Sequence, residues 1–350
     1  MTLSTRTDVK RSPHSSPREH PGSSDFASRE EATTLFGPVP SRRLGRSLGI
    51  DVIPPKTCSF DCVYCESGRT TCHTLERKVF VPPERIIQDL RNHLSDHPGQ
   101  TDILTLSSAG EPTLYSALGD LLHMVKENFP ELPLAVLTNG SLLWDPQVRK
   151  DLRWADIVIP SLDAVTSEVF RTINRPCRGL TVDAILEGLL AFRKEYRGHL
   201  RVEVLLVSHH NDHPAELARL ARVLQAVQPD AVELNTVVRP PAFPGAGGLS
   251  QGAMEGSLAH FSGLNARIIG SYQGGGISRS EDRLDRRILA LLERRPCAAM
   301  EMAQSLSVSP ARMEQTLEGL LKTGSIVAYP HGGALYYCLP TRGHQRSRDG

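Results

Sequence analysis

The chain lacks an excess of charge of either sign. Its 350 residues carry 40 Lys and Arg against 39 Asp and Glu, a formal net charge of +1. This balance gives no general reason to bind nucleic acid or an anionic membrane. The sequence also lacks a run of about 18 apolar residues, the length that spans a bilayer. Its first residues lack the apolar core of a signal peptide. We therefore expect a cytoplasmic protein with no membrane partner.

Cysteine is scarce, but three of the seven cysteines lie within eight residues: Cys58, Cys62 and Cys65. Soft sulfur ligands suit zinc or an iron–sulfur cluster, and a disulfide would use only two of them. Three ligands leave a zinc site incomplete, although Cys72 and His73 lie close enough in sequence to extend it. No second pair of ligands follows at zinc-ribbon spacing. A [4Fe–4S] cluster on three cysteines instead leaves one iron open.

Two motifs and a longer run resemble a known family. The spacing C-x3-C-x-Tyr-C, with Tyr64 before the last cysteine, resembles the signature of the radical S-adenosylmethionine (SAM) superfamily. The run Gly110-Glu111-Pro112-Thr113 resembles its second signature. Residues 36–51 resemble the branch that includes the tRNA wyosine-base-forming enzymes and uncharacterised bacterial relatives. The resemblance covers residues 36–241, which is most of the chain.

The resemblance implies a [4Fe–4S] cluster whose open iron is chelated by SAM. An electron from the cluster then cleaves SAM to a 5′-deoxyadenosyl radical, so an electron donor such as flavodoxin or ferredoxin is also implied. The cluster ligands would be the three clustered cysteines. The implied cofactor-binding residues are Tyr64, beside the adenine; Gly110 and Glu111, near the methionine amino group; and Thr138, Asn139, Ser161 and Asn235, where relatives contact SAM or substrate. One departure is Ala109, where many relatives have a glycine, because alanine tolerates a positive φ poorly.

From residue 48 onward, β-branched segments alternate with amphipathic helices, the pattern of a parallel α/β protein. The expected strands are residues 48–53, 102–107, 134–138, 156–160, 200–207 and 231–235. Six such units predict a partial (β/α)6 TIM-like barrel. The cysteine loop and four of the implied cofactor positions, Gly110, Thr138, Ser161 and Asn235, each lie at or just after the end of a strand. Parallel α/β proteins place their active sites at this edge.

The composition divides the chain further. Residues 1–35 are rich in Ser, Pro and charge and are expected to form a disordered tail. The barrel takes residues 36–239, and the glycine-rich residues 240–279 are expected to form a loop-rich linker or lid with a short strand at 267–269. Residues 280–340 predict three helices and a hairpin, which resemble a winged-helix domain. Residues 341–350 are a second tail.

A winged helix suggests DNA binding, but the charges of this one argue against it. Residues 279–350 carry 11 basic and 8 acidic residues. The expected recognition helix carries Arg312 and Lys322, and Glu314 and Glu318 balance their charge. Duplex binding concentrates Lys and Arg on the docking face. A role in binding a protein or presenting a substrate is at least as well supported as DNA binding.

Four cations are candidates for substrate binding. Arg42, Arg43 and Lys56 bracket the first strand, and Arg239 follows the sixth. The sequence gives them no local acidic partners, so they predict an anionic substrate, because arginine binds phosphate or carboxylate in bidentate fashion. The alternative is that Arg42 and Arg43 only pin the N-terminal segment to the barrel.

Two functional classes stay open. The first is a radical SAM enzyme whose substrate is unidentified, with tRNA and a small anionic molecule as the candidates. The second is a winged-helix regulator in which an iron–sulfur cluster senses redox state or iron. Because a sensor needs no SAM pocket, the residues at the strand ends favour the enzyme.

Overall fold

The computed structural model describes residues 34–41, 43–269, 284–306 and 308–340. Outside these ranges lie residues 1–33 of the expected tail at 1–35, residues 270–279 of the expected lid, the expected tail at 341–350, and Arg42. The expected end of the first tail is wrong, because Thr34 and Leu35 are buried and a strand begins at Leu35. The main sheet has eight strands in the order β1-β2-β5-β6-β7-β8-β9-β10. Its strands are β1 Leu35–Ser41, β2 Gly45–Ile50, β5 Ile103–Leu106, β6 Leu134–Thr138, β7 Ile157–Pro160, β8 His199–Leu206, β9 Ala231–Thr236 and β10 Ala266–Ile268.

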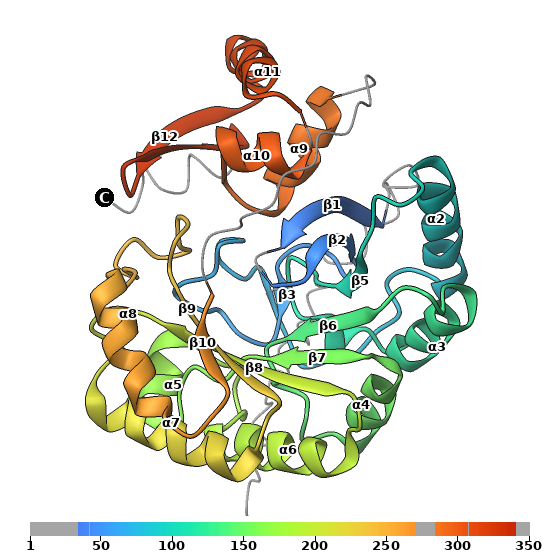
Figure 1. Cartoon of the computed structure of the whole chain (residues 1–350). Coiled ribbons are helices and arrows are strands. Elements are labelled where there is room, and N and C mark those ends of the chain that lie inside the picture. Colours follow the sequence, from blue (N-terminus) through green and yellow to red (C-terminus); the bar gives the residue numbers. More distant parts are fainter. Residues whose placement is uncertain (1–33, 42, 270–283, 307, 341–350) are drawn as a thin grey trace, which may run out of the picture. The chain divides into compact units, whose positions relative to one another are not determined.

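All neighbouring strands from β2 to β10 run parallel, and only β1 pairs antiparallel. The sheet is therefore the expected mostly parallel α/β sheet, consistent with a partial barrel. The helices between its strands cover its outer face (Figure 1). The main ones are α2 Pro83–Asp96, α3 Leu118–Asn128, α4 Pro146–Asp151, α6 Val182–Glu195 and α7 Pro214–Val227. Helix α5 Ser167–Ile173 instead lies against the cysteine loop, where Val63 N donates to Ile173 O at 2.9 Å.

Strand β8 shows how the two faces of the sheet differ. Leu200, Val202, Val204 and Leu206 are fully buried, while the residues between them are only half-buried. Since successive side chains point to opposite faces, the first set packs under the helices and the second faces the interior. Glu203 belongs to the second set, so a carboxylate is placed inside the barrel.

The helix starts follow local chemistry in part. In the sequence, Asp145 followed by Pro146 is the cap-then-proline order that predicts a helix start. The structure has it: the Asp145 side chain accepts from Gln147 N at 2.8 Å, with Pro146 at the first helical position. Ser116, a residue type that caps helices, is likewise expected to cap α3, and this expectation is wrong. The helix begins after Ala117 and has no side-chain cap.

The segment expected to be loop-rich contains regular structure. It carries helix α8 Gln251–Leu258, with Ser250 as its cap, and β10, which adds a seventh parallel strand beside β9. The short strand was predicted, but the helix was not. In α8, Gly252 and Gly256 have little helical propensity, which explains why the sequence pattern missed it.

The C-terminal part comprises α9 Leu284–Arg294, β11 Cys297–Ala298, α10 Ala299–Ser305, α11 Pro310–Lys322, β12 Val327–His331 and β13 Ala334–Cys338. These elements share a core that includes Ile288, Met302, Met313 and Leu317. The hairpin turns at Gly332 and Gly333, both at positive φ, as a two-residue loop requires. The three predicted helices and the hairpin are present, and β11 adds a third strand.

None of the helices in the described ranges is both long and apolar enough to cross a membrane.

Candidate active site

The cysteine loop begins where the short strand β3, Thr57–Cys58, ends. Cys62 and Cys65 follow on a turn in which Cys65 N donates to Cys62 O at 3.1 Å. β3 is tied to the end of β5 by two backbone bonds, Lys56 N to Ala109 O at 2.8 Å and Glu111 N to Thr57 O at 3.0 Å. The three thiols therefore lie at the carboxyl edge of the parallel sheet, where the sequence predicts them.

Each of the three sulfurs accepts a contact from a nitrogen of another side chain. Asn139 Nδ2 lies 3.6 Å from Cys58 Sγ, and Asn174 Nδ2 lies 3.6 Å from Cys62 Sγ. Lys56 Nζ lies 3.9 Å from Cys65 Sγ. Such donors favour negative charge on sulfur. Asn174 was not anticipated, because it follows α5 in no recognisable motif.

Burial raises the pKa of the Cys58 thiol to about 12, and it also raises the pKa of Cys62 well above its ordinary value. In the ligand-free protein these two groups hold their protons. Because thiolates are the metal-binding form, loading of a cluster releases those protons.

Three thiol donors suit an iron–sulfur cluster that keeps one iron open. Within the described ranges, no group of three His, Cys, Asp or Glu side chains is placed to hold one metal ion. Cys72 is exposed, and His73 Nε2 lies 3.0 Å from Ser59 O. This arrangement gives the zinc alternative no support.

Gly110 lets the end of β5 pack on the cysteine loop. A Cβ at this position would overlap Thr57 O, so only glycine permits the close approach. Ala109 is not among the described non-glycine residues with positive φ. Alanine therefore fits where many relatives have a glycine.

Glu111 is buried and braces two strand ends. Its Oε1 accepts from Thr113 N at 2.9 Å and from the hydroxyls of Thr113 and Thr138, each at 2.6 Å. Its Oε2 accepts from Asn139 N at 2.7 Å. Burial raises the pKa of Glu111, although these donors oppose the shift. The carboxylate joins the segment after β5 to the end of β6.

Asn139 connects this brace to the cysteines. Besides its contact with Cys58, its Nδ2 donates to Ser59 Oγ at 2.9 Å, and its Oδ1 accepts from Ser141 N at 2.9 Å. Ser59 and Ser141 in turn share a hydrogen bond of 2.6 Å. Asn139 therefore lies beside Cys58, and Thr138 joins the same network through Glu111.

Tyr64 belongs to a second buried network. Its hydroxyl donates to Asp163, whose Oδ2 also accepts from Asn174 Nδ2 at 2.8 Å. Asp163 Oδ1 accepts from Leu205 N at 2.9 Å. Burial raises the pKa of Asp163 to about 6. Asn174 thus contacts both Asp163 and Cys62, so the turn that carries Tyr64 is held against β7 and β8.

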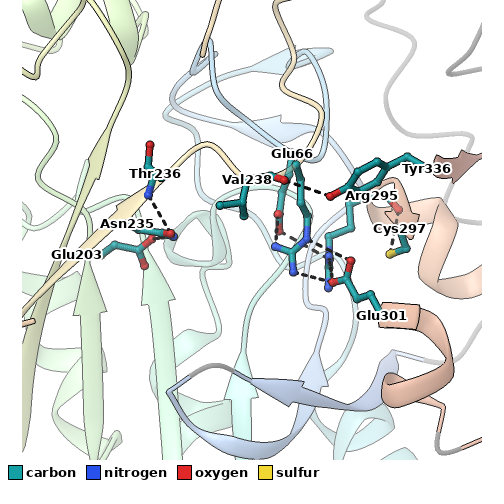
Figure 2. Close-up of polar contacts among 10 residues, drawn as sticks. Glu66, Glu203, Asn235, Thr236, Val238, Arg295, Cys297, Glu301 and Tyr336 are labelled. Atoms are coloured by element: carbon teal, nitrogen blue, oxygen red, sulfur yellow. Dashed lines mark hydrogen bonds and ion pairs between the residues drawn. The ribbon is translucent and has the colours of Figure 1, made fainter. Parts of the chain in front are cut away.

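Ser161 and Asn235 meet at Glu203. Ser161 forms an isolated parallel bridge with Glu203, and Asn235 Nδ2 donates to Glu203 Oε1 at 3.0 Å. Figure 2 shows Asn235 beside Glu203, with Thr236 N donating to Asn235. The ends of β7, β8 and β9 therefore meet on the inner face of the sheet.

Two of the four candidate cations have acidic partners in the fold, although the sequence shows none near them. Arg43 pairs with Glu203 and, at 3.1 Å, with Glu233. Arg239 pairs with Glu66 and Glu301, both at 2.6 Å. The partners are far away in sequence, so no local pattern showed them. Lys56 donates to Gly68 O at 2.9 Å, and Arg42 lies outside the described residues.

A mostly parallel sheet with three thiols at its carboxyl edge is also found in known proteins whose sequences and structures resemble this chain. The family model described as "Radical SAM superfamily" matches residues 52–223. The crystal structure of a radical SAM methyltransferase from Sphaerobacter thermophilus shares the fold, with a TM-score of 0.51 and 16% identity. The alignment covers 63% of this chain and 66% of that one.

More similar sequences come from archaea and bacteria. The UPF0026 protein MJ1312 of Methanocaldococcus jannaschii is 33% identical over 310 residues, covering 87% of this chain and 95% of that protein. The UPF0026 protein of Helicobacter pylori J99 is 34% identical, covering 89% and 99%. The chain therefore belongs to the radical SAM superfamily and, within it, to the UPF0026 family. The superfamily uses a [4Fe–4S] cluster and SAM.

Proposed function

We propose that Cys58, Cys62 and Cys65 hold three irons of a [4Fe–4S] cluster and that the protein cleaves SAM reductively to act on a further substrate. One observation carries this proposal. Three thiols lie on one loop at the carboxyl edge of a parallel sheet, and each has a nitrogen donor near its sulfur. When bound, the cluster supplies the electron that cleaves SAM to methionine and a 5′-deoxyadenosyl radical.

The side chains around the cysteine loop have different roles in this proposal. Asn139, Asn174 and Lys56 stabilise charge on the three sulfurs, and hydrogen bonds to the sulfurs set the reduction potential of such a cluster. Gly110 keeps the backbone at the end of β5 close to the cluster loop. Glu111 is a positioning residue, because both of its oxygens already accept hydrogen bonds.

The strand ends supply the proposed SAM site. Thr138 and Asn139 at the end of β6, Ser161 after β7 and Asn235 on β9 offer hydroxyl and amide groups that can bond a ribose or a carboxylate. The hydrogen bond of Tyr64 to Asp163 fixes the ring of Tyr64 for a place beside the adenine. A sensor would need none of these groups, so they favour an enzyme.

Residues 36–239 form the catalytic barrel in this proposal, residues 240–279 connect it to the C-terminal part, and residues 280–340 form a winged-helix-like unit. The role of this unit is to present a substrate or bind a protein rather than to bind DNA. A flavodoxin or ferredoxin supplies the electron. The resemblance of residues 36–51 to the wyosine-base branch makes tRNA the candidate macromolecular substrate.

The decisive experiment is anaerobic incubation of reconstituted, reduced protein with SAM. We expect 5′-deoxyadenosine and methionine by chromatography, with the product lost in Cys62→Ala. Cys72→Ala is the matched control, since Cys72 is exposed and outside the triad. A fully loaded cluster that yields no 5′-deoxyadenosine would favour the iron–sulfur sensor instead.

A second incubation, with bulk tRNA, tests the substrate. Nucleoside mass spectrometry should then show a new or missing nucleoside that depends on Cys62. If the nucleosides stay unchanged and tRNA does not alter the rate of SAM cleavage, the tRNA hypothesis is wrong.

A further inference from the structure

A cavity of about 180 Å³ lies between the inner face of the sheet and helix α9. Ser47, Thr105 and Ser107 line it from the sheet side. Leu291, Arg294 and Arg295 line it from the C-terminal part, and Ile269 follows β10. Glu66, the residue after Cys65, also lines it. The cavity therefore adjoins the cysteine loop.

The residues that line the cavity carry more positive than negative charge. Four arginines, Arg43, Arg239, Arg294 and Arg295, line the cavity against one carboxylate, Glu66. The other carboxylates that pair with these arginines are outside the lining. They are Glu203 and Glu233 for Arg43, Asp51 for Arg294, and Glu301 for Arg239 and Arg295. These carboxylates pair with the guanidinium groups and hold them in place.

Arg43 and Arg294 keep unused donors. Each directs Nη1 at its acidic partners, and neither Nε nor Nη2 of these two arginines has a hydrogen-bond partner among the described residues. Their side chains are only 13% and 19% exposed. The Arg294 guanidinium also lies 3.7 Å from the centre of the Phe36 ring, which fixes its plane. A guanidinium fixed in this way suits a planar, bidentate acceptor.

The remaining two arginines belong to a rigid wall. Arg239 Nη2 and Arg295 Nη1 both donate to Glu301 Oε1 at 2.6 Å. Figure 2 shows Glu66, Arg295 and Glu301 facing one another, with the Tyr336 hydroxyl donating to Val238 O. These contacts tie α9 and α10 to the cysteine loop and to the segment after β9. The C-terminal part is thus a wall of the cavity.

We propose that this cavity binds a phosphate or carboxylate group of a small-molecule substrate through Arg43 and Arg294. That the bound molecule is a substrate rests on the proposed function, whereas the anion site itself does not depend on SAM chemistry. The cavity volume is about 180 Å³. That is less than the roughly 300–1,000 Å³ of a drug-sized site, so the ligand is compact. Helix α9 then contributes a substrate-binding side chain to the active site.

The test is anion binding by cluster-loaded, anaerobic protein without SAM or reductant. Calorimetric titrations use inorganic phosphate in one arm and acetate in the other, at constant ionic strength. We expect saturable binding of at least one anion, and Arg294→Gln should weaken it by about tenfold or more, the worth of a charged hydrogen bond. Tighter binding of phosphate or of acetate identifies which group the substrate carries.

Arg193→Gln is the matched control, since Arg193 pairs with Asp230 at 3.1 Å and does not line the cavity. Its affinity for the anion should equal that of the unaltered protein. If Arg294→Gln fails to fold, Arg294→Lys keeps the charge beside Asp51 and removes the planar fork, and it too should weaken binding.

Absence of saturable binding of either anion, or equal affinity in the Arg294 variants, would overturn the proposal. The outcome is independent of SAM cleavage. A protein that cleaves SAM but binds neither anion contradicts only the anion site. A protein that binds phosphate but never cleaves SAM contradicts only the proposed enzyme.

Discussion

Arg239 Nη2 donates to Glu301 Oε1 at 2.6 Å, which joins the segment after β9 to helix α10. Arg239 also donates to Glu66, the residue after Cys65. One guanidinium therefore connects the cysteine loop, the barrel and the C-terminal part. Arg239 is 62 residues from Glu301 and 173 residues from Glu66 in the sequence.

We expect Glu301→Gln to weaken this link. The neutral amide removes one of the two carboxylates that pair with Arg239 and Arg295 and leaves them Glu66. The free energy of unfolding should fall by about 1–3 kcal/mol. Denaturant unfolding measures it. Arg295 and Arg239 hold the pKa of Glu301 below its ordinary 4.5 although burial opposes them. The contribution is thus present above about pH 4.5 and is lost as the pH falls further.

The control for this variant is Glu318→Gln, because Glu318 is exposed on α11. Its stability should match that of the unaltered protein. Equal stability of both variants would show that the ion pairs around Arg239 contribute nothing measurable.

Anaerobic reconstitution should give a brown protein with about four irons and four sulfides per chain. The reason is the triad of thiols with an open fourth position. Cys62→Ala should lose most of this iron in elemental analysis, while Cys177→Ala should retain it, because Cys177 is a buried cysteine outside the loop. One zinc per chain and no iron would contradict the assignment.

Gly110→Ala should disturb the cysteine loop. The new Cβ would overlap Thr57 O, and backbone cannot yield as a flexible side chain does. We expect a loss of about 1–3 kcal/mol, typical of overpacking, and slower formation of 5′-deoxyadenosine.

Gly252→Ala provides the comparison, since a Cβ there meets nothing within 4 Å on helix α8. It should be neutral or stabilise the protein by up to about 1 kcal/mol. If Gly110→Ala behaved in the same way, the close approach would have no consequence for stability or turnover.

His93 should make the protein less stable in mild acid. Burial and His97 lower the pKa of His93 to about 4, and its ring stacks on that of His97 at 4.6 Å. Since the unfolded chain takes up the proton near pH 6.5, stability is full above that value and falls as the pH drops toward 4.

We expect the free energy of unfolding to fall by on the order of 1 kcal/mol between pH 7 and pH 5, with partial exposure reducing the effect. His93→Gln should flatten this slope, and His123→Gln, an exposed histidine of α3, should not. Parallel slopes in all three proteins would assign the acid sensitivity to other groups.

Local patterns in the sequence determined much of the fold. Strand β6 has the predicted ends, and α4 has the predicted cap because Asp145 and Pro146 act within one turn. The cysteine triad and the Gly110-Glu111 turn were recognisable because their chemistry depends on short spacings. The helix α8 and the missing cap of α3 were not, since tertiary packing outweighed weak local preferences.

Only the tertiary structure decided which groups are available to a ligand. The sequence could not pair Arg43 with Glu233, 190 residues away, or bring Asn174 to Cys62, 112 residues away. Contacts of this kind depend on how the chain crosses the sheet, which no local pattern encodes. The sequence thus specified the cysteine loop and the alternation of strands and helices. The fold decided that Glu111 is a brace and that Arg43 and Arg294 share one cavity, because buried charges are fixed by partners that only folding brings near.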